Sequence, residues 1–442
     1  MAQIKPFNGI LYNPLKIKDM ADVVTPPYDV ISEKEQRSFH DRHPQNIIRL
    51  ILGEKTDTDS EKNTPHTRAA AYYKDWLTQE ILVRDSSPAF YLSSVEFIVN
   101  NKPSTRYGLM ALVGLEPFEK GIILPHERTF SKVKSERLEL MKASHANFSP
   151  IFSLYKDEKD ILSVLKNSVK GTPPDMDPTD DKGHVHKLWR ITDTVTHEYV
   201  QNAMKQTRLF IADGHHRYET ALNYRDWVAN NDPGFSEHHP ANYVLMYLCS
   251  MQDPGMIILP AHRILKDVPE TDMNLFIKKA EEYFDITPIP FSEQDRQKAL
   301  DEFLDSLKSN ASKNSIGVFL NTQSIFYLLT LKKGAMEKKF GHTLPDVLRS
   351  LDVTVLTQLI FMEILSFSKE RLDDKQLIAY SSSAEEAVSL VEPGRYDMAF
   401  ILNPTRIEQV RNVAEEGLIM PRKSTYFYPK VITGQVINPL TP

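Results

Sequence analysis

The sequence of 442 residues contains a single cysteine, Cys249, so it cannot form an internal disulfide and offers no cysteine cluster for zinc. It also lacks an apolar run of about 18–20 residues, the length that a membrane-spanning helix needs. Its first residues do not show the charged-then-apolar pattern of a signal peptide. These absences predict a cytoplasmic protein that makes no membrane contact.

The chain has no excess of basic residues, since its net charge is −6. The sequence also shows no basic helix-turn-helix candidate. We therefore expect a small-molecule partner and no nucleic acid. Neither the Walker phosphate loop nor the Rossmann glycine motif occurs. Hydrophobic residues make up 41% of the chain and charged residues 25%, which are values of a globular protein. The sequence does not indicate an oligomeric state.

The pattern of apolar residues predicts an α+β fold with mixed sheets. Strands are expected at 90–99, 107–115, 150–155, 186–191, 208–211, 244–251, 256–265, 377–380 and 397–402, with a hairpin over 315–332. Helices are expected at 66–80, 134–145, 158–169, 196–205, 218–229, 273–284, 293–307, 355–365, 384–391 and 406–416. The runs 244–251 and 256–265 are predicted to be neighbouring strands, and Lys170–Gly183 to be a flexible loop.

The length predicts more than one domain. We expect a catalytic core with insertions over residues 1–265 and an inserted or appended α+β unit over 266–350. A C-terminal α/β segment over 351–442 is expected to pack back on the core.

The most informative stretch is Ala212–Arg217, which reads Ala-Asp-Gly-His-His-Arg between a short apolar strand and a helix. A strand-to-helix turn presents backbone N–H groups and the positive end of a helix dipole to an anion. Gly214 allows a positive φ or a close ligand, and Arg217 can form two hydrogen bonds with a phosphate or carboxylate. The turn is therefore predicted to be an anion site.

Two histidines in this turn, His215 and His216, can exchange protons near neutral pH. Adjacent helical residues diverge by about 100°, so one of the two is expected to face the reacting centre. Asp213 could orient a histidine or hold Mg²⁺. The alternative is a helix capped by Asp213 with its polar first turn in water. No transition-metal ligand set is expected here, because the pair lacks a partner at helical spacing.

Two further loops carry candidate residues. In Pro26-Pro27-Tyr28-Asp29 the prolines fix φ, so a rigid extended element is expected to hold Tyr28 and Asp29. Asp29 is a candidate base or ligand for a substrate amine, or else it caps a connecting turn. In the charged run His126-Glu127-Arg128, Glu127 is the candidate general base for a substrate hydroxyl, and His126 a substrate ligand; otherwise Glu127 is a surface acid.

The remaining candidates are basic or hydroxyl side chains. Arg137 is either an anion ligand or a surface arginine. His262 and Arg263 could add a second anion contact, with a buried structural histidine as the alternative. The C-terminal patch, made of Arg422, Lys423, Ser424, Thr425 and Lys430, suits a phosphate or carboxylate unless it is a solvated loop.

Four stretches together resemble a widespread prokaryotic family known only as a domain of unknown function, over nearly the whole chain. They are Thr25–Ser32, His126–Thr129 with Ser149–Phe152, Ile211–Ala221, and Met420–Thr425 with Tyr428–Lys430. Gly214-His-His-Arg217 after a strand also resembles the phosphate loop of the ParB/sulfiredoxin-like fold. Asp213-Gly-His-His-Arg217 is similar to the Asp-Gly-His-Thr-Arg of that superfamily's free-serine kinases. The sulfiredoxin cysteine is replaced here by His215, so sulfinic-acid reduction has no nucleophile.

The resemblance implies a ParB/sulfiredoxin-like core and phosphoryl transfer on a small hydroxy amino acid, with serine or phosphoserine favoured. The kinase and phosphatase directions both stay open, and ATP or ADP and Mg²⁺ are candidate cofactors. The alternatives are a nucleotide-binding regulator of the ParB type and a metal-assisted hydrolase that uses Asp213, His215 and His216. Because none of the four polar loops has a local partner, we expect Thr25–Ser32, His126–Thr129, Asp213–Arg217 and Arg422–Thr425 to line one pocket.

Overall fold

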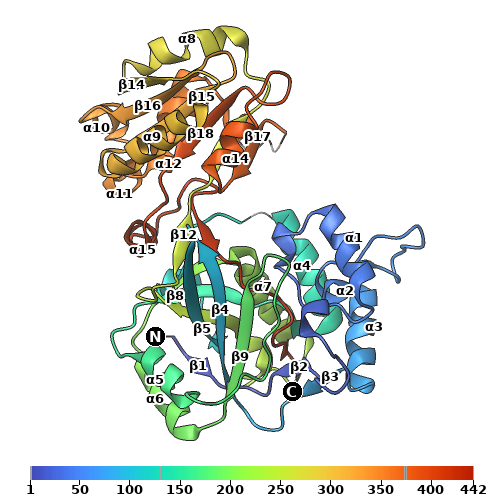
Figure 1. The fold of residues 1–442 in the computed structure, drawn as a ribbon. Helices are drawn as coiled ribbons and strands as arrows, with labels where there is room; N and C mark the ends of the chain where they lie inside the picture. The colour runs from blue at the N-terminus through green and yellow to red at the C-terminus, as the bar shows by residue number, and fades with distance from the viewer. Residues whose placement is uncertain (1, 130, 373, 375, 442) are drawn as a thin grey trace. The chain divides into compact units, whose positions relative to one another are not determined.

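The computed structural model describes residues 2–129, 131–372, 374 and 376–441 (Figure 1). The chain forms two compact units. Unit 1 comprises Met1–Ile257 together with Pro429–Pro442, and unit 2 comprises Ile258–Tyr428. Where the chain passes between them, β12 (Ile257–Leu259) pairs with β19 (Tyr426–Tyr428).

Unit 1 is built on an eight-stranded mixed sheet in the order β6-β10-β8-β11-β5-β4-β9, with β1 added beside β5. The β10–β6 and β11–β8 pairs are parallel and the others are antiparallel. The strands are β1 (Ile4–Lys5), β4 (Phe90–Val99), β5 (Lys102–Gly114), β6 (Ile123–Leu124), β8 (Ile151–Tyr155), β9 (Val185–Ile191), β10 (Leu209–Asp213) and β11 (Tyr243–Ser250).

One face of this sheet is apolar because alternate residues of each strand point to it. Leu92, Leu109, Ile211 and Leu248 lie in one buried cluster with residues of α5 (Ile161–Ser168), α6 (Thr194–Met204) and α7 (His215–Asn231). The free energy of burying this cluster therefore fixes α7, and with it the Ala212–Arg217 stretch, against the sheet.

The opposite face of the sheet is more polar. The buried Arg106 guanidinium lies 4.7 Å from the ring centroid of Phe152 and 5.5 Å from that of Tyr247. A Cβ at Gly108 would meet the Tyr247 ring at 2.1 Å, so this close approach requires glycine. Ser93 Oγ donates to Gln435 Oε1 at 3.0 Å, which brings the end of the chain to this face.

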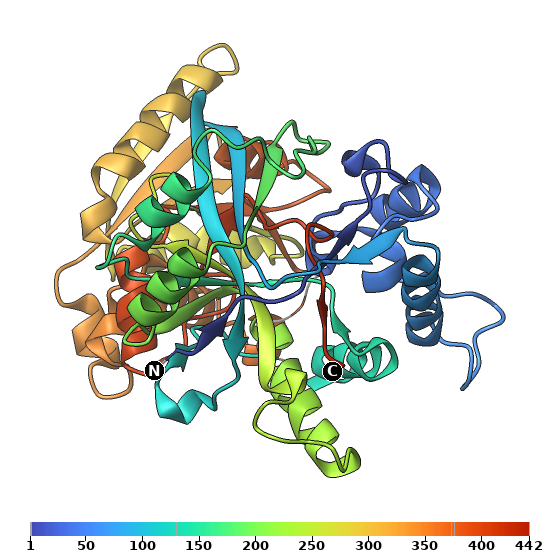
Figure 2. The ribbon, with the colours of Figure 1, turned by 90° about the horizontal axis from the view of Figure 1, so that it is seen from below.

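The C-terminal segment runs through unit 1 beside the N-terminal region, red next to blue in Figures 1 and 2. Thr25 pairs with Thr433 and Ile10 with Ile437, and β20 pairs with β7. A second apolar core holds the N-terminal helices together around Trp76 and Phe148. These elements are α1 (Glu33–Arg42), α2 (Ile48–Ile51), α3 (Pro65–Thr78), α4 (Ser131–Ser144), β2 (Ile10–Tyr12), β3 (Leu82–Arg84), β7 (Ala146–Asn147) and β20 (Asn438–Pro439).

Unit 2 contains a six-stranded antiparallel sheet in the order β14-β16-β15-β18-β13-β17. Phe303 of α9 packs with Phe326 in a core on one face, while Phe276 of α8 packs on Phe400 of β18. The strands are β13 (His262–Leu265), β14 (Phe284–Pro290), β15 (Ser315–Leu320), β16 (Ile325–Leu331), β17 (Ile378–Ser381) and β18 (Met398–Leu402). The helices are α8 (Glu270–Ala280), α9 (Arg296–Ser309), α10 (Ala335–Phe340), α11 (Asp346–Arg349), α12 (Asp352–Val355), the π-helix Leu356–Ile364, α13 (Lys369–Leu372), α14 (Ala384–Ser389) and α15 (Ile407–Glu415).

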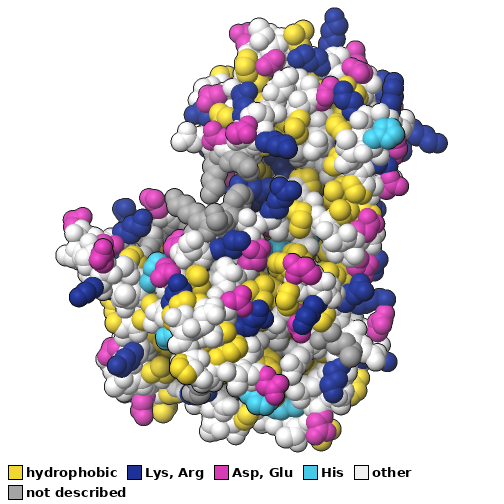
Figure 3. All heavy atoms as spheres, turned by 180° about the vertical axis from the view of Figure 1, so that it is seen from behind, with side chains coloured by type: hydrophobic (Ala, Val, Ile, Leu, Met, Phe, Trp, Pro, Cys, Tyr) yellow, Lys and Arg dark blue, Asp and Glu magenta, His cyan; other side chains and the backbone are white. Residues whose placement is uncertain are grey.

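The structure confirms the α+β class with mixed sheets, and it confirms the hairpins β4–β5 and β15–β16. The ParB/sulfiredoxin-like core stays a prediction. No helix in the described part of the chain is long and apolar enough to cross a membrane. The face in Figure 3 shows acidic and basic side chains interspersed.

Two predictions were wrong. The run 256–265 is not one strand beside 244–251, since it divides into β12 and β13, and β13 pairs with β17 and β18. The predicted boundaries at 265 and 350 also fail, because β14–β16 share one sheet and one core with β13, β17 and β18. Residues 266–350 are therefore part of a larger unit.

Candidate functional site

The Ala212–Arg217 stretch forms a tighter connection than its sequence predicts. Asp213 is the last residue of β10, Gly214 alone makes the turn with φ 93°, and α7 begins at His215. The backbone conformation favours glycine, and a Cβ on Gly214 would lie 2.9 Å from Arg217 Nε, so a larger residue would also displace the Arg217 side chain. Asp213 does not cap the helix, because Gly214 occupies that position without a side-chain cap. The first N–H groups of α7 have no carbonyl partner within the helix.

A compact ionic cluster joins three side chains at this helix start. Asp213 Oδ2 accepts from Arg217 NH2 at 2.6 Å, and Asp213 Oδ1 accepts from Lys430 Nζ at 2.8 Å. Arg217 NH1 also donates to the carbonyl oxygen of Pro150. The three side chains are between 11% and 16% exposed. One carboxylate is therefore shared by two largely buried cations, so these three side chains carry a summed charge of +1 before the nearby Asp29 carboxylate is counted.

This environment shifts the pKa of the acid and of the arginine. Burial alone would raise the pKa of Asp213, but the charges of Lys430 and Arg217 outweigh it and hold that pKa well below its usual range. Burial alone would lower the pKa of Arg217, and the carboxylates of Asp213 and Asp29 raise it instead. Asp213 and Arg217 are thus both charged at neutral pH.

His126 and His215 form a buried pair beside the cluster. Their rings meet edge to face with centroids 4.8 Å apart, and the His126 backbone N–H donates to His215 Nε2 at 3.2 Å. Burial lowers the pKa of His215 well below its usual value, so the ring is neutral. A neutral ring that accepts at Nε2 carries its proton on Nδ1, which lies 3.9 Å from Glu127 Oε2. His215 therefore connects the Glu127 loop to α7.

Lowering the pH from about 6.5 to about 4 is expected to destabilise unit 1 through His126. Burial lowers the pKa of His126 to about 4 in the folded state, whereas an unfolded histidine titrates near 6.5. Between these values the unfolded chain binds more protons, so this stability is full above pH 6.5 and is lost on acidification, by about 3 kcal/mol.

Urea unfolding of wild type and of His126→Gln at pH 7 and pH 4.5 measures this contribution. The variant is expected to lose less stability than wild type over that interval. His238→Gln is the matched control, since the His238 side chain is 83% exposed. Equal pH dependence in wild type and His126→Gln would contradict the prediction.

His216 faces a different set of groups, as adjacent helical residues must. It is partly buried, which lowers its pKa, while the carboxylates of Glu219 and Asp29 act in the opposite direction. Glu219 is itself held by Thr129 Oγ1 at 2.7 Å and by Lys134 Nζ at 2.5 Å. Of the two adjacent histidines, His216 is the more accessible one.

Tyr28, Arg137 and Arg217 line a small cavity of about 50 Å³ together with Ser149 and Thr220. The Arg137 guanidinium lies 4.3 Å from the Tyr28 ring centroid, and its NH1 donates to the carbonyl of Ile51 at 2.6 Å. Its Nε is buried and has no hydrogen-bond partner within the described residues. Burial raises the pKa of the Tyr28 hydroxyl. Tyr28 begins a short 3-10 turn (Tyr28–Val30), so the predicted extended element ends at Pro27.

The other candidates belong to unit 2, where they make internal bonds. His262 Nδ1 accepts from the Leu402 N–H at 3.1 Å, and burial lowers its pKa to about 4. Arg263 NH2 donates to the carbonyl of Lys423 at 2.9 Å, and burial lowers its pKa to about 10. Ser424 Oγ donates to the Pro421 carbonyl, and Ser424 and Thr425 are both buried. These contacts place His262, Arg263 and Ser424 in the packing of unit 2. Lys423 is exposed, and an anion-binding role of Lys423 and Thr425 stays a prediction.

The structure thus brings together Tyr28, His126, Glu127 and Asp213–Arg217. It places two further predicted candidates with them, Arg137 and Lys430. Asp29 is close enough to influence the pKa of Arg217. Convergence of Arg422–Thr425 on this group stays a prediction. Asp213, His215 and His216 do not form a metal-ligand set, because Asp213 is bonded to two cations and His215 Nε2 accepts a backbone hydrogen bond.

Comparison with solved structures finds distant likenesses. A conserved hypothetical protein from Pyrococcus furiosus is 12% identical with a TM-score of 0.33, and the match covers 75% of this chain and 94% of that one. A free serine kinase in complex with AMP is 11% identical with a TM-score of 0.33, covering 72% and 86%. A C-terminally truncated SbnI from Staphylococcus aureus is 12% identical with a TM-score of 0.35, covering 75% and 87%. At such scores the likeness carries no argument about function.

No curated protein sequence matches the chain. A family model does match, over residues 4–354, and its description is a protein of unknown function, DUF1015. The matched segment includes the Asp213–Arg217 turn and most of unit 1. The chain therefore belongs to the DUF1015 family.

Proposed function

We propose that unit 1 is an enzyme that transfers a phosphoryl group to or from a small hydroxy amino acid, with serine or phosphoserine as the favoured substrate. The observation that carries this proposal is the pair of largely buried cations, Arg217 and Lys430, that share the single carboxylate of Asp213 at the start of α7. Together with the helix dipole, these two cations favour a bound anion. The resemblance of Asp213-Gly-His-His-Arg217 to the loop of the free-serine kinases adds the substrate class.

Each neighbouring group has a role in such a reaction. In the kinase direction the serine Oγ attacks the terminal phosphorus of ATP or ADP, Glu127 or Asp29 takes the hydroxyl proton, and the bond from phosphorus to the nucleotide oxygen breaks. In the phosphatase direction Glu127 or Asp29 takes a proton from the attacking water, and the bond from phosphorus to the serine oxygen breaks. The serine oxygen leaves with a proton from His216 in its protonated form. Arg217, the α7 amides and Lys430 stabilise the phosphoryl oxygens. His215, which is neutral and bonded to the Glu127 loop, is a positioning residue.

The cavity sets a limit on what binds deep in the site. At about 50 Å³ it has room for a small group beside Tyr28, Arg137 and Arg217, whereas whole-ligand pockets are typically about 300–1,000 Å³. The buried Arg137 Nε, which lacks a partner within the described residues, offers a donor to that group. We infer that a phosphate or carboxylate enters the cavity and that a nucleotide base, where one is used, lies outside it. ATP or ADP would bring Mg²⁺ with it.

An assay of the purified full chain decides between the directions. Serine is supplied with ATP or ADP and magnesium in one arm, and phosphoserine alone in the other, with phosphoserine or phosphate as the product measured. His216→Ala and Glu127→Gln are expected to lower kcat strongly with a small change in KM. His215→Ala is expected to change KM and stability as well, because it releases the Glu127 loop.

The same panel tests the alternatives. A nucleotide that raises the melting temperature without any turnover would favour a ParB-like regulator. Activity that is lost with a chelator and restored by a transition metal would favour a metal-assisted hydrolase. If no substrate turns over, and neither nucleotide nor phosphoserine raises the melting temperature, the phosphoryl-transfer proposal is wrong.

A further inference from the structure

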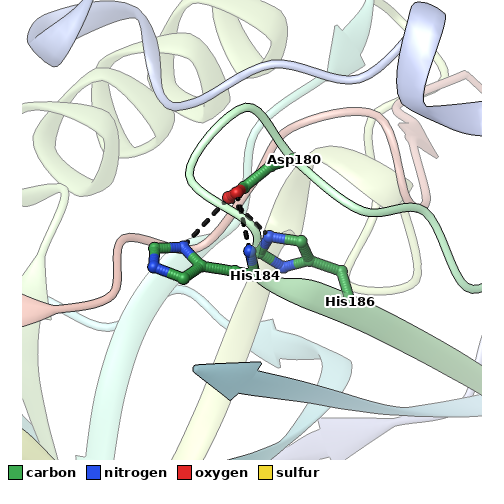
Figure 4. Close-up of side chains that lie close together, drawn as sticks. All are labelled: Asp180, His184 and His186. Atoms are coloured by element: carbon green, nitrogen blue, oxygen red, sulfur yellow. Dashed lines mark hydrogen bonds and ion pairs between the residues drawn. The ribbon is translucent and has the colours of Figure 1, made fainter. Parts of the chain in front are cut away.

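A second cluster of polar side chains lies on the polar face of the unit 1 sheet, around the start of β9. His184 Nδ1 and His186 Nε2 each lie 3.0 Å from the same oxygen, Asp180 Oδ2 (Figure 4). The three side chains converge from a loop and the adjoining strand. Both histidines are buried, with side chains 6% and 4% exposed, and Asp180 is 22% exposed.

The backbone explains why these three residues meet. Asp180 and His184 close a tight turn, in which the Asp180 N–H donates to the His184 carbonyl at 2.9 Å and Gly183 has φ 78°. His184 and His186 are two apart in an extended segment, so both side chains point to the same face. Asp180 Oδ1 accepts from the N–H groups of Lys182 and His184 at 2.9 and 3.0 Å. This anchors the carboxylate and leaves Oδ2 to face both rings.

We propose that Asp180, His184 and His186 bind a divalent transition metal, Zn²⁺ by preference. Two imidazole nitrogens and one carboxylate oxygen are a ligand set that such ions favour, and Mg²⁺ or Ca²⁺ would prefer oxygen ligands. At bond lengths of about 2.0–2.2 Å, a tetrahedral ion holds its ligand atoms roughly 3.3 Å apart. The three ligand atoms here lie within 4.8 Å of one another, so a small closing movement completes the site.

The arrangement matches a metal centre in two further respects. The backbone bonds to Asp180 Oδ1 are the outer contacts that orient a ligating carboxylate. Three protein ligands leave a fourth position for water or a substrate atom, as in metal sites that do chemistry.

This metal site is separate from the proposed phosphoryl-transfer site and does not depend on it. In the sheet, β9 and β10 are separated by β8, β11, β5 and β4. At about 4.8 Å for each strand spacing, the two strands are roughly 24 Å apart. Loss of metal binding would thus leave the Asp213–Arg217–Lys430 cluster as it is.

The competing explanation is a metal-free network in which both rings donate a proton to Asp180 Oδ2. Untagged full-length protein, stripped with a chelator, distinguishes the two when it is titrated with Co²⁺ and Zn²⁺. We expect one equivalent of Co²⁺ to bind with visible absorption bands of a four-coordinate ion, and one equivalent of Zn²⁺ to displace it at micromolar concentration. Mg²⁺ is expected not to compete.

Two ligand variants and one control make the assignment specific. His186→Gln and Asp180→Asn are expected to weaken Zn²⁺ binding by more than the roughly 10- to 100-fold that loss of an outer contact costs. His239→Gln is the control, because His239 is also buried and lies 3.4 Å from a single carboxylate, that of Asp232. Circular dichroism checks that each variant is folded. The wild-type cobalt spectrum needs no variant, and its absence, or equal losses in His186→Gln and His239→Gln, would overturn the proposal.

Discussion

Replacement of Asp213 by asparagine is expected to lower the free energy of unfolding of unit 1 by about 3–5 kcal/mol. The substitution removes the carboxylate that Arg217 and Lys430 share at 2.6 and 2.8 Å, and it leaves two cations facing each other in a largely buried place. The cost comes from these uncompensated charges more than from the lost bonds. Urea unfolding followed by circular dichroism at pH 7 measures it.

Asp226→Asn is the control for this prediction. Asp226 lies on the same helix and pairs with Arg225 at 3.0 Å, but its side chain is 63% exposed. An exposed pair of this kind contributes at most about 1 kcal/mol. If the two substitutions cost the same, the Asp213 cluster does not have the strength that its burial implies.

The pH dependence of the free energy of unfolding is a second, independent test of the Asp213 contribution. The pKa of Asp213 is lower in the folded protein than in the unfolded chain, where it is about 3.9. The stabilisation is therefore present above about pH 3.9 and is lost as the pH falls through the folded pKa. Asp213→Asn should remove that acid-induced loss, in a window below the one assigned to His126.

Local pattern predicts local structure well in this chain. The hairpin β4–β5 follows from alternating residues around a polar spacer, and α7 follows from the helical spacing after Gly214. The prediction of an anion site at Asp213–Arg217 rests on residue types. The structure places Arg217 in a largely buried position, paired with the Asp213 carboxylate. The chemistry itself stays a prediction.

Long-range partners could not be predicted from one sequence. Lys430 lies 217 residues from Asp213, and no local spacing indicates that they pair. Arg263 has the residue type of an anion ligand, but its donors are used by the carbonyls of Arg422 and Lys423. The unit boundaries failed for the same reason, since β13 finds its partners in β17 and β18 more than 100 residues away.

The Asp180, His184 and His186 cluster was missed although its signal is in the sequence. An Asp-x-x-x-His-x-His spacing beside an extended segment places two imidazoles on one face. The glycines and prolines of Lys170–Gly183 predict a loop, but in the structure this stretch also forms isolated bridges with β9. Because the predicted loop contains Asp180 and the predicted strand contains His186, the predicted elements give no sign that Asp180 contacts the two histidines.

Arg217→Lys is expected to lower kcat/KM for the phosphorylated substrate by at least about 100-fold, which corresponds to roughly 3 kcal/mol of transition-state stabilisation. Arg217 uses NH1 on the Pro150 carbonyl and NH2 on Asp213, and these two bonds fix its guanidinium beside the cavity. A lysine supplies the charge but cannot make both bonds in fixed directions, so it would bind Asp213 and withdraw from the phosphoryl group.

The measurement is steady-state kinetics with phosphoserine, or with serine and nucleotide, together with the shift in melting temperature that each ligand causes. Arg225→Lys is the matched control, because Arg225 is two turns further along α7 and pairs with an exposed carboxylate. We expect that control to stay within about threefold of wild type. Since Lys430 remains paired with Asp213 in Arg217→Lys, the fold should persist, and a loss of turnover can be assigned to the anion contact. Turnover near the wild-type rate in Arg217→Lys would show that the guanidinium holds the chain together at this point and does not act on the phosphoryl group.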